Sequence, residues 1–408
     1  MIPPLIKGNT ASASVVRSGP VGIYSEYLDK KLDFQALTQE RKKQLKRISQ
    51  LRGDRDVLVI AADLKKGHQA ISINHTDLLA VNDQLSNLKG KALDLILETP
   101  GGSGEVAEDI VRLLRGRYDS VGVIVPGIAK SAGTIMAMAG DEILLEPVSA
   151  LGPIDAQIQW QGKVFSAHAL LEGMEKIKAE VTNTGTLNRA FIPILQNISP
   201  GELQHAQNAL DFARELVREW LARYKFKDWK THSSNGAPVT EEERKTRATE
   251  IADALCDHGK WKTHGRSIKL DDLRAMRLRV TDYSEQADLC DAIRRYYTLL
   301  QMTFDTNIYK LFETPDSQII RFEIMAGVPA GLKDQTAQAD VAMLDLECNK
   351  CKTVMKIQAN FKKNLPTQTE RIPFPADNKV KCPTCGTEHD LTAMRHQIEA
   401  QTKRSIIT

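Results

Sequence analysis

The sequence predicts an α/β fold, because short apolar runs alternate with segments of helical periodicity along its first half. The runs 57–62, 92–97, 120–125 and 142–145 have the length and composition of strands buried in a parallel sheet. Amphipathic segments follow the first two runs, and a stretch of small residues beginning at Ser131 follows the third. Strands and helices that alternate in this way form right-handed crossovers. We therefore expect a mostly parallel sheet covered by helices.

The segments around this core predict the domain organisation. Residues 1–54 are expected to form an N-terminal extension with a charged helix, and residues 55–310 the core domain. Within the core, a helical insertion is expected at about 184–262, where Ser199 and Thr240 each begin the pattern of a capping box. The remaining stretches predict a linker at 311–343, a small cysteine-containing module at 344–395 and a tail at 396–408.

The composition is that of an ordinary folded protein. Of 408 residues, 42% are hydrophobic and 26% are charged, and a net charge of +3 does not by itself predict a polyanionic partner. No run approaches the roughly 18 apolar residues needed to cross a bilayer, and the N-terminus lacks the pattern of a signal peptide. Four of the six cysteines stand in C-x-x-C pairs, which suits a reducing compartment. We expect a cytoplasmic protein with no transmembrane segment.

Two glycine-containing turns carry the chemistry, and each follows a predicted strand. One turn contains Gly101 and Gly102, and the other contains Ser131. In a parallel sheet both turns lie at the carboxyl edge, where open α/β folds bind their ligands. The diglycine lets backbone N–H groups approach a substrate oxygen, and a serine at a helix start has orphan N–H groups beside it. Taken singly, the diglycine is an ordinary turn and the serine is an ordinary N-cap. Taken together, the two turns have the groups that acyl transfer requires.

The motif Pro100-Gly-Gly followed by Lys130-Ser-Ala-Gly-Thr resembles the Clp protease proteolytic subunit and signal peptide peptidase A, and most closely the serine dehydrogenase proteinase family. The resemblance covers about residues 55–300, and it includes the segments 131–142, 150–155, 264–268 and 273–280. It implies a Clp/crotonase-type core, usually a homo-oligomer, that cleaves a peptide or protein substrate. By this resemblance Ser131 is the nucleophile, and the oxyanion donors are the amides of Gly101, Gly102 and Ala132.

The general base is harder to assign. Clp subunits carry a histidine where this chain has Asp155, and no histidine stands near it in the sequence, which argues against such a triad. Relatives of signal peptide peptidase use a lysine from the next helix, so Lys176 is the predicted base and Lys178 its neighbour. A lysine base must be neutral, so burial has to lower its pKa by several units. An ordinary solvated lysine is the alternative, His168 is a second candidate, and Lys130 ranks last.

The second motif predicts a structural zinc ribbon. Cys348, Cys351, Cys382 and Cys385 form two knuckles, and thiolates from two such turns complete tetrahedral Cys₄ coordination of Zn²⁺. A redox dithiol pair and an iron–sulfur cluster are the competing interpretations. Nearby lysines permit contacts with nucleic acid without demonstrating them: Lys350, Lys352, Lys356, Lys362 and Lys363. The isolated Cys256 and Cys290 are expected to be buried apolar residues.

Two functions from different classes follow from these motifs. The first is a serine endopeptidase that forms an acyl-enzyme at Ser131, with a Ser-Lys dyad. The second is an inactive oligomeric scaffold of the same fold, whose zinc ribbon binds nucleic acid or a protein. An acyl-CoA enzyme of the crotonase type shares the fold but does not explain the serine after Lys130. An apolar pocket with a lysine amine within hydrogen-bond reach of Ser131 would favour the peptidase.

Overall fold

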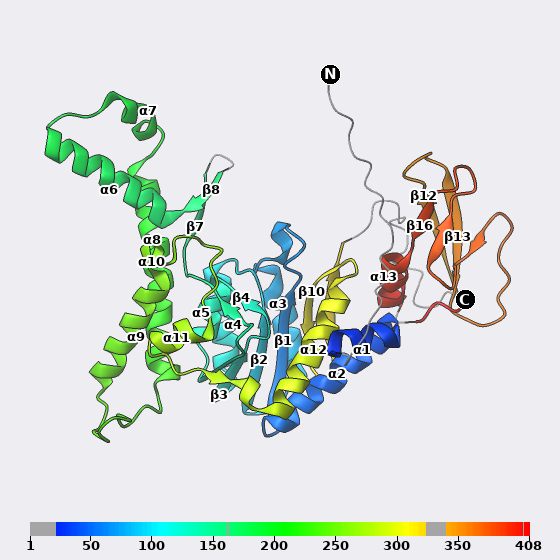
Figure 1. Cartoon of the computed structure of the whole chain (residues 1–408), viewed down its shortest axis with the longest axis horizontal. Coiled ribbons are helices and arrows are strands. Elements are labelled where there is room, and N and C mark those ends of the chain that lie inside the picture. Colours follow the sequence, from blue (N-terminus) through cyan, green and yellow to red (C-terminus); the bar gives the residue numbers. More distant parts are fainter. Residues whose placement is uncertain (1–21, 161–162, 324–339, 403) are drawn as a thin grey trace.

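The computed structural model describes residues 22–160, 163–323, 340–402 and 404–408. Its centre is a seven-stranded sheet in the order β11-β10-β1-β2-β3-β5-β9 (Figure 1). The four strands predicted from apolar runs are confirmed and pair in parallel: β1 (Asp56–Ala62), β2 (Ala92–Glu98), β3 (Ser120–Ile124) and β5 (Glu142–Leu145). The short β9 (Thr281–Asp282) extends this parallel part at one edge.

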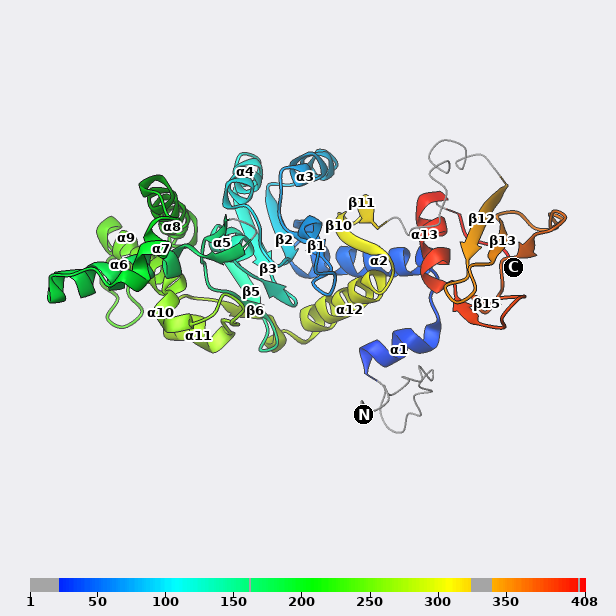
Figure 2. The same cartoon turned by 90° about the horizontal axis from the view of Figure 1, so that it is seen from above.

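Helices cover both faces of the sheet (Figure 2). One face carries α3 (Thr76–Ser86), α4 (Gly104–Arg115) and α5 (Ala132–Met138), and the other carries α2 (Phe34–Leu51) and α12 (Ala287–Phe304). Successive strand residues point to opposite faces, so Leu58 packs in one apolar cluster and Val57 in the other. A strand buried on both faces reads as an unbroken apolar run, which is why these strands were visible in the sequence.

The N-terminal helices belong to this layered core, which corrects the predicted extension at 1–54. Leu45 and Ile48 of α2 are fully buried in the same cluster as Val57 of β1. The preceding α1 (Ile23–Lys30) buries Tyr27 against Leu299 of α12. The many charged residues on the other face of α2 make the helix appear solvent-exposed when only its composition is considered, although one stripe of it is apolar. Residues 1–21 of that prediction lie outside the described residues.

The core also continues beyond residue 310, which corrects the predicted linker at 311–343. β10 (Ile308–Glu313) pairs antiparallel with β1, and β11 (Gln318–Phe322) pairs with β10. A tight turn joins them, in which the amide of Thr314 donates to the carbonyl of Ser317 at 2.9 Å. All of β11 is partly exposed because it is an edge strand, so its apolar signal is weak. Residues 324–339 of the predicted linker lie outside the described part.

Between the core strands, the chain leaves the sheet and returns through short strands, a hairpin and a helical arm. Two short strands border the turns after β3 and β5, namely β4 (Ile128–Ala129) and β6 (Ala150–Leu151). The hairpin is β7 (Gln157–Trp160) and β8 (Lys163–Ser166). The helices are α6 (Ala167–Thr184), α7 (Ile192–Leu195), α8 (Pro200–Trp220), α9 (Glu241–Cys256), α10 (His258–Trp261) and α11 (Leu270–Ala275). Both predicted capping boxes, at Ser199 and Thr240, are present. In Figure 1, α6 and α7 project away from the sheet.

The C-terminal module has its own small core. Its elements are β12 (Val341–Glu347), β13 (Val354–Asn360), β14 (Ile372–Pro373), β15 (Lys379–Lys381), β16 (Glu388–Asp390) and α13 (Thr392–Thr402). Ile398 and Ile406 are buried in this module, so the predicted tail at 396–408 is corrected to part of it. α13 packs against α2, and the Ser405 hydroxyl donates to Gln35 at 3.0 Å. Among the described helices, none combines the length and hydropathy that crossing a bilayer requires.

Candidate functional site

The two glycine-containing turns meet at the carboxyl edge of the sheet. Gly101 and Gly102 follow β2 with φ values of 105° and 146°, which only glycine adopts readily. A Cβ placed on Gly101 would lie 2.7 Å from the Cβ of Ser131 and 2.8 Å from the carbonyl oxygen of Lys130. No side chain fits in that space. The missing side chain therefore lets the diglycine backbone contact the turn that carries Ser131.

Backbone hydrogen bonds hold the diglycine turn on both sides. Toward Ser131, the Thr99 amide donates to the Ile128 carbonyl at 2.9 Å, and the Lys130 amide donates to the Thr99 carbonyl at 3.1 Å. On the other side, the Ile73 amide donates to the Gly101 carbonyl at 2.8 Å, and Ile73 is buried. The turn is thus a fixed part of the sheet edge.

Ser131 has an unusual backbone for a residue with a side chain. Its φ is 51° and its ψ is −115°, a sparsely populated conformation of a kind that often marks functional sites. It directly precedes α5, yet its side chain makes no capping hydrogen bond. The interpretation of Ser131 as an ordinary N-cap is therefore wrong. Within the described chain its partly exposed hydroxyl has no hydrogen-bond partner.

The three predicted oxyanion donors are not equivalent. The Gly101 amide donates to the Thr99 hydroxyl at 3.1 Å, so it is already engaged. The amides of Gly102 and Ala132 find no acceptor among the described residues. Gly102 stands on the diglycine turn and Ala132 is the first residue of α5. Each turn therefore contributes one amide that remains free to bind an oxygen.

The predicted lysine base lacks the burial that the prediction requires. Lys176 of α6 has a side chain that is 74% exposed and pairs with Glu172 at 2.7 Å. Lys178 is 72% exposed and pairs with Glu175. His168, also on α6, stacks on His258 with ring centroids 5.2 Å apart. In this chain, α6 projects from the core and leaves both lysine side chains in solvent.

A buried carboxylate with two histidines lies in the loop after β6. Asp155 is 5% exposed and accepts hydrogen bonds from the Ser166 hydroxyl at 2.7 Å and from the side-chain amide of Gln157 at 3.0 Å. One of its oxygens lies 3.6 Å from Nδ1 of His258 and 3.9 Å from Nδ1 of His264. Burial lowers the pKa of His264; the Asp155 charge opposes this shift and the Lys130 charge adds to it. Its imidazole is therefore mainly neutral at pH 7.

The segment that carries His264 packs beside the Ser131 turn. The Lys130 ammonium donates to the carbonyl of Gly265. Leu151 and Ile268 exchange two backbone hydrogen bonds, at 3.0 and 2.9 Å. His264 was not among the bases predicted from the sequence, because it stands 133 residues after Ser131 in the chain. The signal in the sequence that pointed to this segment was that residues 264–268 are among those that resemble the family.

The four cysteines of the C-terminal module also come together. Their sulfur atoms all lie within 4.8 Å of one another. The sulfurs of Cys348 and Cys385 are 3.6 Å apart, and those of Cys351 and Cys382 are 3.5 Å apart. Tetrahedral zinc–sulfur bonds of about 2.3 Å would space the sulfurs about 3.8 Å apart. The donor set and its spacing fit a metal ion. Cys256 and Cys290 are buried, as predicted.

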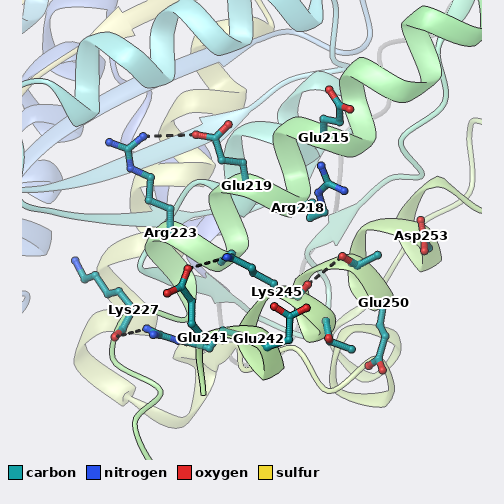
Figure 3. Close-up of a pocket in the computed structure, with 14 residues that line it drawn as sticks. Glu215, Arg218, Glu219, Arg223, Lys227, Glu241, Glu242, Lys245, Glu250 and Asp253 are labelled. Carbon is teal, nitrogen blue, oxygen red and sulfur yellow. Dashed lines mark hydrogen bonds and ion pairs between the residues drawn. The ribbon is translucent and has the colours of Figure 1, made fainter. Parts of the chain in front are cut away.

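A hollow lies between α8 and α9, and neither the residues of the serine site nor the four clustered cysteines line it (Figure 3). It has a volume of about 1010 Å³, and acidic and basic side chains alternate on its walls. Many of them neutralise one another, as Lys245 does with Glu241 at 2.7 Å and Arg223 with Glu219 at 3.5 Å. Neither free amide nor Ser131 lines it. The volume of this hollow therefore does not identify it as the reactive site.

The core is a mixed α/β fold with a serine facing a diglycine turn at one edge of its sheet. Residues 23–228 match the ClpP-like SDH-type serine proteinase family, and the chain belongs to this family. The predicted family is thereby confirmed. His264 and the four cysteines lie outside the matched residues.

Two uncharacterized proteins of Methanocaldococcus jannaschii are similar to this chain, at 30% identity over 168 residues and 32% over 136 residues. The alignments cover 40% and 33% of this chain and 54% and 42% of those proteins, so the chain spans about half the length of the curated relatives it matches.

Two solved structures are similar over about half of this chain. One is a serine-to-alanine mutant of the 1510-N membrane-bound stomatin-specific protease, with 13% identity, a TM-score of 0.31, and coverage of 53% of this chain and 79% of that chain. The other is a lysine-to-alanine mutant of that protease in complex with a substrate peptide, with 14% identity, a TM-score of 0.30, and coverage of 52% and 70%.

Proposed function

We propose that this chain is a serine endopeptidase that cleaves peptide bonds through an acyl-enzyme at Ser131. One observation carries the proposal: the diglycine backbone contacts a serine whose hydroxyl makes no hydrogen bond to any described residue. A peptide carbonyl bound between the two turns would place its oxygen near the free amides of Gly102 and Ala132. Preorganised amides of this kind stabilise the oxyanion, and removing one donor costs about 10² to 10³ in kcat.

We assign the general base to His264 and its orientation to Asp155, in place of Lys176. The imidazole of His264 is half-buried and burial lowers its pKa, so it can accept a proton at pH 7, whereas the Lys176 side chain is exposed and paired with Glu172. The 3.9 Å between His264 and Asp155 is longer than a hydrogen bond, as is common before substrate binds. His258 flanks the same carboxylate. The Lys130–Gly265 contact favours His264, because it ties the His264 segment to the Ser131 turn.

The reaction then proceeds in two steps. The Ser131 oxygen bonds to the peptide carbonyl carbon, and its proton passes to Nε2 of His264. The imidazole gives that proton to the leaving amine as the C–N bond breaks. Water then attacks the ester carbon and loses a proton to the same nitrogen. The imidazole returns that proton to the Ser131 oxygen as the ester C–O bond breaks, which releases the acid and restores the Ser131 hydroxyl.

The test is covalent labelling of the full chain with a fluorophosphonate probe, followed by identification of the modified residue. We expect one phosphonate on Ser131 and none on the Ser131→Ala variant. Ser103→Ala is the matched control, since Ser103 caps α4 through the Val106 amide at 3.1 Å and has no role in the reaction. Equal labelling of wild type and Ser131→Ala would refute the assignment.

We also propose that the four cysteines hold a structural Zn²⁺ ion. Four thiolates are a donor set typical of structural zinc sites, and zinc there lets a small module fold. The His389 ring nitrogen lies 3.3 Å from the Cys348 sulfur, where an N–H group would stabilise a thiolate ligand. The predicted homo-oligomer, cytoplasmic location and nucleic-acid contacts of the ribbon stay predictions.

A further inference from the structure

Glu98, the last residue of β2, is a buried acid that the proposed reaction does not use. It is 1% exposed, and among the described residues no lysine or arginine pairs with it. One carboxyl oxygen accepts from the Ile128 amide at 2.8 Å, and the other accepts from the Tyr297 hydroxyl at 3.2 Å. A buried carboxyl without a cation is costly to a fold. Its presence at this point therefore calls for a reason beyond packing.

The contacts of Glu98 join the two turns of the candidate site. Glu98 precedes Thr99, whose hydroxyl binds the Gly101 amide and whose carbonyl accepts from the Lys130 amide. Its side chain reaches across to the Ile128 amide, three residues before Ser131 in the chain. One residue thus holds the start of the diglycine turn through its backbone and the start of the serine turn through its carboxyl.

The space around this carboxyl is tightly filled from both sides of the sheet. A Cβ on Gly127 would lie 2.5 Å from the nearer carboxyl oxygen of Glu98, so the serine turn rests directly on this group. Tyr297 comes from α12, the helix that covers the opposite face to α5. Burial raises the pKa of Glu98 to about 8, against the hydrogen bonds from Ile128, Tyr297 and Gly127. The carboxyl is therefore neutral or nearly so at pH 7, which reduces the cost of its burial.

We propose that Glu98 is a positioning residue whose carboxyl, held by Tyr297, sets the separation between the diglycine amides and Ser131. The proposal rests on the proposed function, since it gives Glu98 a role only in a reaction at Ser131. The carboxyl touches neither substrate nor Ser131 and acts through the Ile128 amide. A displacement of the serine turn by a fraction of an ångström would misplace the Ala132 amide, which such sites do not tolerate.

The experiment measures the maximal rate constant of fluorophosphonate labelling of Ser131, at saturating probe and per folded molecule, in the full chain. We expect Glu98→Ala to lower this rate on the order of 10²-fold, comparable to the loss of one oxyanion donor. Glu98→Gln, which keeps the shape and an acceptor for the Ile128 amide, should recover the rate to within about tenfold of wild type. Tyr297→Phe should lie between them.

The matched control is Asp94→Asn, at the opposite end of β2. Asp94 is equally buried and binds Arg52 at 2.8 Å and Arg55 at 2.7 Å, so its loss lowers Tm without touching either turn. It should label at the wild-type rate. Wild-type labelling of Glu98→Ala, or equal slowing of Asp94→Asn, would show that Glu98 serves stability alone. If Glu98→Ala does not fold, Tyr297→Phe decides: a wild-type rate overturns the proposal. Failure of wild type itself to label would instead refute the proposed function.

Discussion

The serine site and the cysteine cluster are assembled in different ways. The cysteine cluster uses two tight turns of one small module, and each turn supplies two cysteines that are close in sequence. The serine site brings together the turns after β2 and β3, and its proposed base and orienting carboxylate, His264 and Asp155, come from two further segments. A cluster made of local pairs can be predicted from the spacing of its residues in the sequence. When a site is assembled from distant segments, the sequence reveals only those segments that carry a local pattern.

The largest expected effect tests whether the serine site is catalytic. Ser131→Ala should lower peptidase kcat by about 10⁶, as loss of a nucleophile does in serine proteases. The variant should fold normally, because the Ser131 hydroxyl caps no helix. Casein or peptide turnover is the measurement, with Ser103→Ala as a control that keeps its activity. Residual activity in Ser131→Ala above about one hundredth of wild type would place the chemistry elsewhere.

The second prediction separates the distant base from the local one. His264→Gln should lower kcat by at least about 10³, because the proposed general base would be lost. Lys176→Ala should change kcat by less than about twofold, since its exposed side chain and its ion pair with Glu172 take no part in the proposed reaction. Steady-state kinetics of both variants on one peptide provide the comparison. A reversed order would restore the lysine dyad, and the site would then be as local as the cysteine cluster.

The third prediction concerns the independence of the two regions. Chelation, or Cys348→Ser, should unfold the C-terminal module, because structural zinc supplies roughly 10 kcal/mol or more to small modules. Metal analysis should find one zinc per chain, and limited proteolysis after chelation should cut within residues 341–402. Ser131 labelling should persist. The reason is that, among the described residues, Ala400 is the only residue of the module that packs against the two apolar clusters of the sheet. If labelling stops together with metal loss, the two regions form one cooperative unit.

The smallest expected effect is in the pH profile. Burial lowers the pKa of His264 from its ordinary value near 6.5. A base acts when neutral, so kcat/KM should stay level above neutrality and fall tenfold per pH unit below the lowered pKa. The acid limb should therefore have its midpoint below about 6.5. Rates at each pH are measured with a parallel check of folding. A midpoint above 7 would indicate a lysine base.

Much of the fold could be predicted because its signals are local. The four buried strands read as apolar runs, and the helices after Ser199 and Thr240 begin with capping boxes that the structure contains. β11 was missed because an edge strand is partly exposed along its whole length. The layer formed by α2 was missed because the charged face of that helix conceals its buried stripe.

The candidate site could be predicted only in part, for a related reason. Ser131, the diglycine and the cysteine pairs stand in short patterns whose chemistry follows from covalent neighbours. The choice of base depends on which ionisable group is buried beside Ser131, and burial is a property of packing.

The sequence by itself determined the order of strands and helices, the serine and diglycine turns, and the two cysteine pairs. Only the tertiary structure decided that Lys176 is exposed, that His264 and Asp155 lie together, and that Glu98 spans the two turns. The physical reason is distance along the chain. Local conformation depends on nearby residues, whereas burial, pKa and contact between distant segments exist only after the core has packed.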